Sequence, residues 1–117
     1  HYFRGGQLPQ ARRFRRFRGC RLFQEHSRRI RKESGYGKFR AGDVLVVPYT
    51  NSDRLPYMTE AAAVISEEIS PEGRTATVGL LLHKPVIIGA VHATRRLSDG
   101  VQVSVDCARG IVQVMPH

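Results

Sequence analysis

The residues with the clearest capacity for chemistry are Gly73, Arg74 and Thr75, which lie in the first turn of an expected helix. A helix N-terminus presents free backbone N–H groups, and a guanidinium group beside them strengthens their attraction for an anion. One hypothesis is therefore that Gly73, Arg74 and Thr75 hold a phosphate or sulfate ion without reacting with it. The favoured interpretation is that Arg74 forms a surface ion pair with Glu68 or Glu72, which would contribute little to stability.

Other side chains that could do chemistry are isolated in the sequence. Cys20 and Cys107 lie far apart and belong to no CxxC or Cys/His spacing, so no metal site is expected. We interpret them as two buried thiols, unless the fold brings them close enough for a disulfide. His83 and His92 are expected at a helix end and on the surface. No paired carboxylates, glycine-rich phosphate loop or nucleophile–base set is evident, so no catalytic residue is assigned.

Positive charge is concentrated in the first third of the chain. Residues 1–40 contain 13 arginines and lysines against two glutamates, a net charge of +11, whereas residues 41–117 have a net charge of −2. This asymmetry indicates attraction to a polyanion or an acidic partner surface, or a solvated basic face. Residues 1–18 are interpreted as an arginine-rich arm or a first strand, with nucleic-acid binding unfavoured because ARRFRRFR is short. The arginines of this basic arm are Arg12, Arg13, Arg15, Arg16 and Arg18.

The hydrophobic pattern of the rest predicts short buried strands. Continuous apolar runs rich in β-branched residues are typical of strands covered on both faces, and they occur at residues 44–47, 62–66 and 86–88. Residues 101–105 alternate, with the valines expected inward and the polar residues outward, and residues 111–114 return as a hairpin.

The segments between these strands predict helices and turns. Residues 54–61 form a short helix, and the main helix starts with Ser70 as N-cap and Pro71 at its first position and ends at His83–Lys84. Gly79 within it costs about 1 kcal/mol relative to alanine, so we expect it to pack closely on a sheet.

The connections are less clearly defined. Residues 91–97 are a short helical connection, and residues 19–24 are a weaker strand candidate. A polar connection follows that strand, with room for a helical turn before Gly35 and Gly37 stop it.

Length and composition indicate one folded domain. The chain has 117 residues, of which 41% are hydrophobic and 25% charged, as in ordinary globular domains. It contains neither an apolar run that could span a membrane nor a secretory signal. We expect residues 19–117 to form the domain, as a fragment or processed product because the chain begins at His1, with a cytoplasmic location and no membrane contact.

Four segments together resemble the phosphohistidine, or swivelling, domain of phosphoenolpyruvate-utilising enzymes. They occur in the family's order and spacing, and read GDVLVVPYTNSDRLPYM, AAAVISEE, VGLLLHKPVIIGAVHAT and LSDGVQVSVDCARGIV. The resemblance runs from about Arg40 to Val114 and is closest to the extra C-terminal domain of bacterial pyruvate kinases. It implies an α/β fold of three β/β/α layers, with mixed sheets and one main helix after the Glu67–Glu68 turn.

The resemblance places Arg74 where the family has its phosphoryl-carrying histidine. The family motif Gly-Gly-x-Thr-Ser-His-Ala-Ala aligns without a gap after Glu67–Glu68, and none of its catalytic positions is kept. A carrier needs a neutral imidazole nitrogen as nucleophile, whereas arginine is always protonated and has no lone pair to offer. His83 lies about 13 Å further along a helix, too far to replace the missing histidine.

The resemblance therefore implies a non-catalytic mobile domain, as a C-terminal piece of a pyruvate kinase with a structural, assembly or anion-effector role. Mg²⁺ and K⁺ would belong to a catalytic barrel outside these residues, so no cofactor is expected here. Expected partners are the protein's own catalytic domain, a neighbouring subunit and a phosphate- or sulfate-like anion. The alternative is a repurposed stand-alone module that binds a polyanion or nucleic acid through the basic arm.

Overall fold

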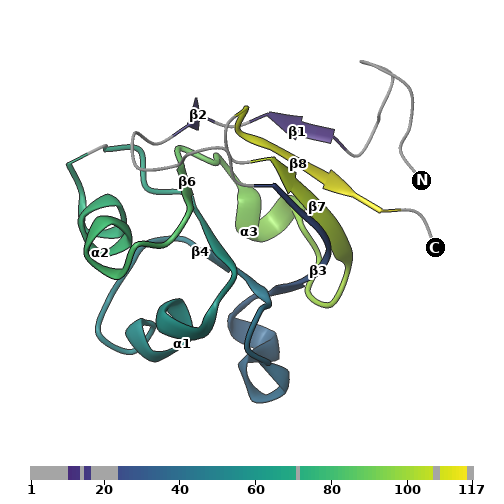
Figure 1. Cartoon of the computed structure of the whole chain (residues 1–117), viewed down its shortest axis with the longest axis horizontal. Coiled ribbons are helices and arrows are strands. Elements are labelled where there is room, and N and C mark those ends of the chain that lie inside the picture. Colours follow the sequence, from purple (N-terminus) through teal and green to yellow (C-terminus); the bar gives the residue numbers. More distant parts are fainter. Residues whose placement is uncertain (1–10, 14, 17–23, 71, 107–108, 116–117) are drawn as a thin grey trace.

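The computed structural model describes residues 11–13, 15–16, 24–70, 72–106 and 109–115, with side chains from residue 28 onward. Figure 1 shows its helices and strands. The strands are β1 (Ala11–Arg13), β2 (Arg15–Arg16), β3 (Gln24–Arg31), β4 (Val44–Val47), β5 (Ala63–Ser66), β6 (Val86–Ile88), β7 (Gln102–Asp106) and β8 (Ile111–Val114). The helices are α1 (Leu55–Glu60), α2 (Arg74–Leu82), α3 (Ala93–Arg96) and a 3₁₀ helix, η2 (Glu33–Lys38).

All eight strands belong to one curved mixed sheet, in the order β1-β8-β7-β3-β4-β5-β6-β2. Strands β3 to β6 are parallel neighbours, as expected when helices connect successive strands. On the other side of β3, the β7, β8 and β1 strands pair antiparallel. Strand β3 thus joins a parallel half to an antiparallel half.

Two hydrophobic clusters, one on each face of the parallel strands, divide the fold into three layers (Figure 1). Leu45, Val47 and Val64 pack with Met58 of α1 and Ala76 of α2. On the opposite face, the alternate residues Val44, Val46 and Ile65 pack with Leu97 at the end of α3 and with Val103 and Val112 of the antiparallel strands. The predicted three-layer β/β/α fold is therefore confirmed.

The close approach of α2 to the sheet depends on Gly79. A Cβ atom at this position would collide with Cγ2 of Val86 in β6, which is fully buried. The expectation that this glycine packs against a strand is confirmed. It lets the helix backbone lie directly over β6.

Three details differ from the sequence-based predictions. The polar residues after Gln24 are a strand rather than a connection, because β3 hydrogen-bonds with β7 on one side and β4 on the other. Gly35 and Gly37 lie within η2 instead of stopping it. Ser104 is buried although it was expected outward, since it faces the buried Gln113 in the β7–β8 ladder.

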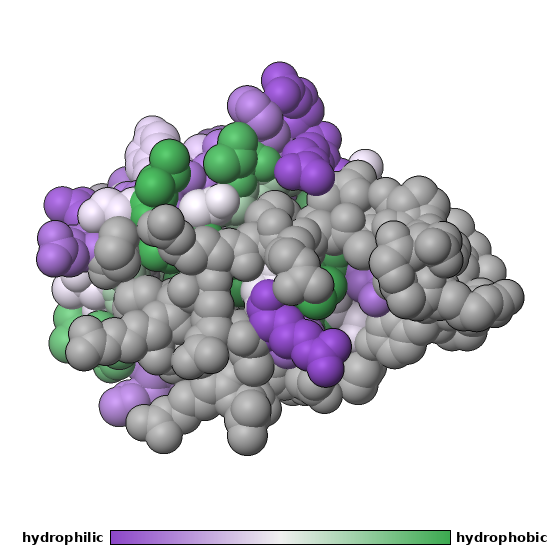
Figure 2. All heavy atoms as spheres, turned by 90° about the horizontal axis from the view of Figure 1, so that it is seen from above, coloured by the Kyte–Doolittle hydropathy of each residue, from purple (hydrophilic) through white to green (hydrophobic). Residues whose placement is uncertain are grey.

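The surface carries both polar and apolar side chains. Seen from above, hydrophobic groups emerge between hydrophilic ones (Figure 2). Among the residues whose side chains are described, the large hydrophobic ones that are exposed are Tyr49, Leu55, Ile69, Leu80, Leu81 and Val91. None of the helices in the described part of the chain combines the length and apolarity required to cross a bilayer.

Candidate functional site

Arg74 is the first residue of α2, and Gly73 is its N-cap with extended backbone angles (φ −77°, ψ 180°). The prediction that Ser70 caps the helix is wrong. Ser70 forms a local turn instead, in which its hydroxyl accepts from the Glu72 N–H at 3.2 Å and its carbonyl accepts from the Gly73 N–H at 3.1 Å. Pro71, expected at the first helical position, lies outside the described residues.

The N-terminus of α2 already holds an anion supplied by the chain itself. Glu68 follows the end of β5, and its Oε1 accepts a hydrogen bond from the Thr75 N–H at 2.8 Å. A carboxylate is favourable here because of the positive end of the helix dipole. Gly73 and Thr75 both donate within the chain, so the N–H groups of these two residues are already committed.

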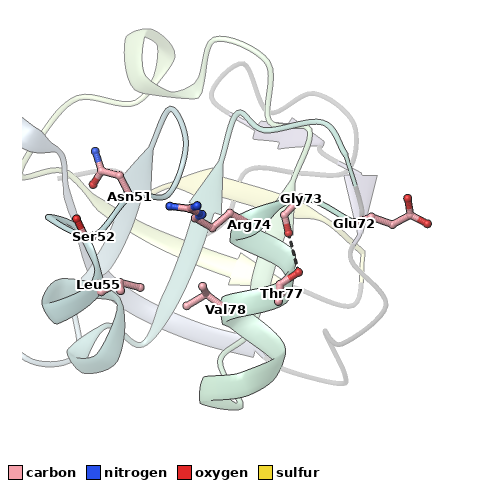
Figure 3. Close-up of a pocket in the computed structure, with 8 residues that line it drawn as sticks. All are labelled: Asn51, Ser52, Leu55, Glu72, Gly73, Arg74, Thr77 and Val78. Carbon is pink, nitrogen blue, oxygen red and sulfur yellow. Dashed lines mark hydrogen bonds between the residues drawn. The ribbon is translucent and has the colours of Figure 1, made fainter.

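The Arg74 side chain is exposed and forms no ion pair with Glu68 or Glu72. The predicted surface pair is therefore not present. Figure 3 shows the guanidinium extending from the start of α2 toward the Asn51–Ser52 loop, while the Glu72 carboxylate points the other way. The guanidinium is thus available to a ligand.

A cavity of about 510 Å³ lies between α2 and the segment that leads into α1 (Figure 3). Leu55 of α1 and Val78 of α2 point toward one another across it. Its lining residues are Asn51, Ser52, Leu55, Glu72, Gly73, Arg74, Thr77 and Val78. The cavity is a depression open to solvent, with a volume in the range of small-molecule sites.

Thr75 faces the core rather than the cavity. Its buried hydroxyl lies 2.6 Å from that of Thr50 and 3.2 Å from that of Ser66. Ser66 Oγ also accepts from the Glu68 N–H at 3.0 Å, which holds the Glu68 segment in place. Sequence reasoning missed this hydroxyl cluster, although Ser66 as the last residue of a buried strand was a visible signal.

The histidines of the described region lie where the sequence analysis placed them. His83 is the exposed C-cap of α2 in the left-handed conformation (φ 54°), and His92 is an exposed residue at the start of α3. Neither is at the start of α2. Only the backbone of His26 is described.

The basic arm contributes two strands at the sheet edges. Arg12 and Arg13 belong to β1, which pairs with β8, and Arg15 and Arg16 belong to β2, which pairs with β6. Arg18, Cys20 and Cys107 lie outside the described residues, so the arm's side chains and the cysteine separation stay predictions. Within the described ranges, no group of three or more His, Cys, Asp or Glu residues is placed to hold a metal ion.

The fold places the chain among three-layer α/β domains. Comparison with known families then identifies which family of such domains it belongs to. The family model described as "PEP-utilising enzyme, mobile domain" matches residues 39–110. The chain belongs to this family, and the resemblance noted in the sequence is confirmed.

The relatives are much longer proteins named as pyruvate kinases and phosphoenolpyruvate synthases. Pyruvate kinase 2 of Synechocystis sp. is 41% identical over 75 residues, which cover 64% of this chain and 13% of that protein. Phosphoenolpyruvate synthase of Aeropyrum pernix is 39% identical over 80 residues, or 68% of this chain and 10% of the synthase. The chain therefore spans about a tenth of the length of these relatives.

Solved structures share the fold at low sequence identity. The Enzyme I protein nEIt superimposes with a TM-score of 0.54 and 22% identity, over 68% of this chain and 33% of that one. Aconitase X of Thermococcus kodakaraensis gives a TM-score of 0.63 and 18% identity, over 91% of this chain and 98% of that one. At these identities the similarity shows the fold alone.

Proposed function

We propose that this chain is a non-catalytic mobile domain, which binds an anion through Arg74 instead of carrying a phosphoryl group. The observation that carries the proposal is the Arg74 guanidinium, which stands at the first position of α2 and points into a cavity without an acidic partner. A guanidinium attracts phosphate or carboxylate but has no lone pair with which to attack phosphorus.

The domain works within a longer enzyme of the pyruvate kinase type, in cytoplasmic glycolytic phosphoryl transfer. This part of the proposal is supported by the pyruvate kinases among the relatives. The Mg²⁺ and K⁺ of that reaction bind in the separate catalytic part, and the domain contributes to subunit assembly or responds to an anionic effector. Its partners are the catalytic domain and a neighbouring subunit.

The anion-binding role is tested by NMR titration of the ¹⁵N-labelled chain with inorganic phosphate and sulfate. We expect progressive shifts at Arg74, Thr77 and Val78, which line the cavity. These shifts should disappear in Arg74→Met, which keeps the length of the side chain but not its charge. Arg95→Met, on the exposed surface of α3, is the matched control. If Arg74→Met and the original chain gave identical titrations, the proposal that Arg74 binds an anion would be wrong.

A second candidate function rests on the net charge of +11 in residues 1–40. A domain with such a segment could bind a polyanion, including nucleic acid, through phosphate contacts. Affinity for single- and double-stranded DNA and RNA would then fall steeply with salt, with a slope that counts the contacts. A flat response across the salt series would exclude this candidate.

A further inference from the structure

We infer that the cavity beside Arg74 takes an organic anion: a carboxylate or phosphate ester joined to an apolar body of several carbon atoms. This inference rests on the proposed anion-binding function and specifies the ligand class for the same site. Arg74 binds the charged end, and Leu55 and Val78 contact the apolar body.

The walls of the cavity favour an apolar body. Leu55 is 37% exposed although it belongs to α1, and Val78 is half-buried on the facing side of α2. Both side chains point into the same space (Figure 3). Apolar surface in a concave site gains free energy when a ligand removes it from water.

The polar groups of the lining leave Arg74 as the recognition group for charge. The Asn51 oxygen already accepts from the Arg54 N–H at 3.1 Å, and the Thr77 hydroxyl donates to the Gly73 carbonyl at 3.0 Å. The guanidinium of Arg74 has five N–H donors and can hold two oxygens of one carboxylate or phosphate. An anionic group is therefore the ligand group that pairs best with this side chain.

Inorganic phosphate fits the site less well than an organic anion. A bare ion placed at the helix start would meet the Glu68 carboxylate, which already occupies the Thr75 N–H at 2.8 Å. Held by Arg74 alone, it would leave Leu55 and Val78 in contact with water. An anion with an apolar body avoids the like charge and covers both side chains.

A second cavity, of about 470 Å³, provides a useful contrast. It is lined in part by Lys32 and Glu33, but Lys32 Nζ donates to the Thr94 carbonyl at 2.7 Å and Glu33 lies 3.6 Å from the Arg54 guanidinium. Its charged groups are thus engaged within the protein. The cavity at Arg74 is the better candidate, because the Arg74 guanidinium forms no ion pair within the described part of the protein.

The test is an NMR titration series with acetate, butyrate, hexanoate, hexanol and inorganic phosphate. A fully buried methylene raises affinity about fourfold, so partial burial in this cavity should raise it about twofold. Hexanoate, with four more methylenes, should then bind about sixteenfold more tightly than acetate, and more tightly than phosphate. Loss of a charged hydrogen bond weakens binding about tenfold or more, so Arg74→Met should lose hexanoate but keep the weak binding of hexanol.

One further variant tests the apolar wall of the site, and Arg95→Met again serves as the control. Leu55→Ser, at an exposed position of α1, should flatten the dependence on chain length while leaving acetate unchanged. Arg95→Met should behave like the original chain throughout.

The outcomes distinguish the inference from the function on which it rests. Phosphate binding at Arg74 with equal affinity for acetate and hexanoate would overturn the organic-anion inference and leave the anion-binding function intact. Equal affinity for hexanol and hexanoate would also overturn it, since charge would then play no part. If no anion in the series shifts the cavity signals, the anion-binding function falls together with the inference.

Discussion

At the scale of single residues, Arg74 determines what the start of α2 can do. A positive, permanently protonated side chain at this position excludes nucleophilic attack on phosphorus, and its free orientation toward the cavity favours binding. The sequence was sufficient to place Arg74 in the first turn of the helix, although the helix begins later than the predicted start at Ser70. It could not show that Glu68 takes the Thr75 N–H, because that contact depends on how the loop after β5 folds back.

The hydroxyl cluster around Thr75 gives a prediction about stability. Thr75→Val keeps the shape but removes the group that links Thr50 and Ser66, at 2.6 and 3.2 Å. We expect a loss of about 1 kcal/mol in the free energy of unfolding, measured by urea denaturation. Thr59→Ala, at an exposed position of α1, should change it by less than about 0.5 kcal/mol. Equal stability of the two variants would show that the cluster contributes nothing.

Tyr36 gives a prediction about pH. Burial raises the pKa of Tyr36 above its usual 10.0, and the neighbouring Arg54 guanidinium opposes this shift only in part. Below pH 10 the phenol is neutral in both the folded and unfolded states. Above it the unfolded chain ionises first, so stability falls as the pH rises toward the folded pKa. Tyr36→Phe should reduce that loss in denaturation curves between about pH 9 and 11, and an unchanged pH dependence would contradict the assignment to Tyr36.

At the scale of elements, α2 is positioned by its contact with β6 and by its cap. Gly79→Ala should lower the free energy of unfolding by about 1 kcal/mol, because the collision with Val86 outweighs the gain in helix propensity. Gly37→Ala is the control, since a Cβ there meets no atom within 4 Å, and it should be neutral or slightly stabilising. A stabilised Gly79→Ala would mean that α2 does not lie this close to the sheet.

The Glu68 cap is the second element-level prediction. Glu68→Ala removes the acceptor of the Thr75 N–H at the positive end of the helix dipole, so we expect a loss of about 1 kcal/mol. Amide exchange at Thr75 should accelerate at the same time. Glu72→Ala, whose carboxylate points away from Arg74, should leave that amide unchanged (Figure 3). Equal exchange rates in the two variants would refute the cap.

The elements also show where sequence patterns were sufficient and where they were not. The buried strands β4, β5 and β6 follow from their continuous apolar runs. Strand β3 could not be predicted from QEHSRRIR, because this strand gains its stability from pairing on both sides. Its end is fixed by Arg31, which binds Asp43 at 3.0 Å and Asp99 at 3.3 Å, residues that are distant in sequence.

At the scale of the whole molecule, the family and the three-layer fold were predictable, since the matching segments fall in the expected order over residues 39–110. The edge strands β1 and β2 were less predictable, because they lie in an arginine-rich segment without strand-like alternation. The cavity depends on the spacing between α2 and the α1 segment, which no local pattern specifies.

The central claim is that this mobile domain does not carry a phosphoryl group. The most direct measurement is the intact mass of the chain after incubation with phosphoenolpyruvate, Mg²⁺ and the catalytic part of a phosphoenolpyruvate synthase, followed by analysis without acid. The corresponding histidine-containing domain of that synthase serves as the positive control. We predict that the mass of this chain stays unchanged while that of the control rises by one phosphoryl group. An acid-labile phosphoryl group on this chain, at His83, His92 or elsewhere, would contradict the account.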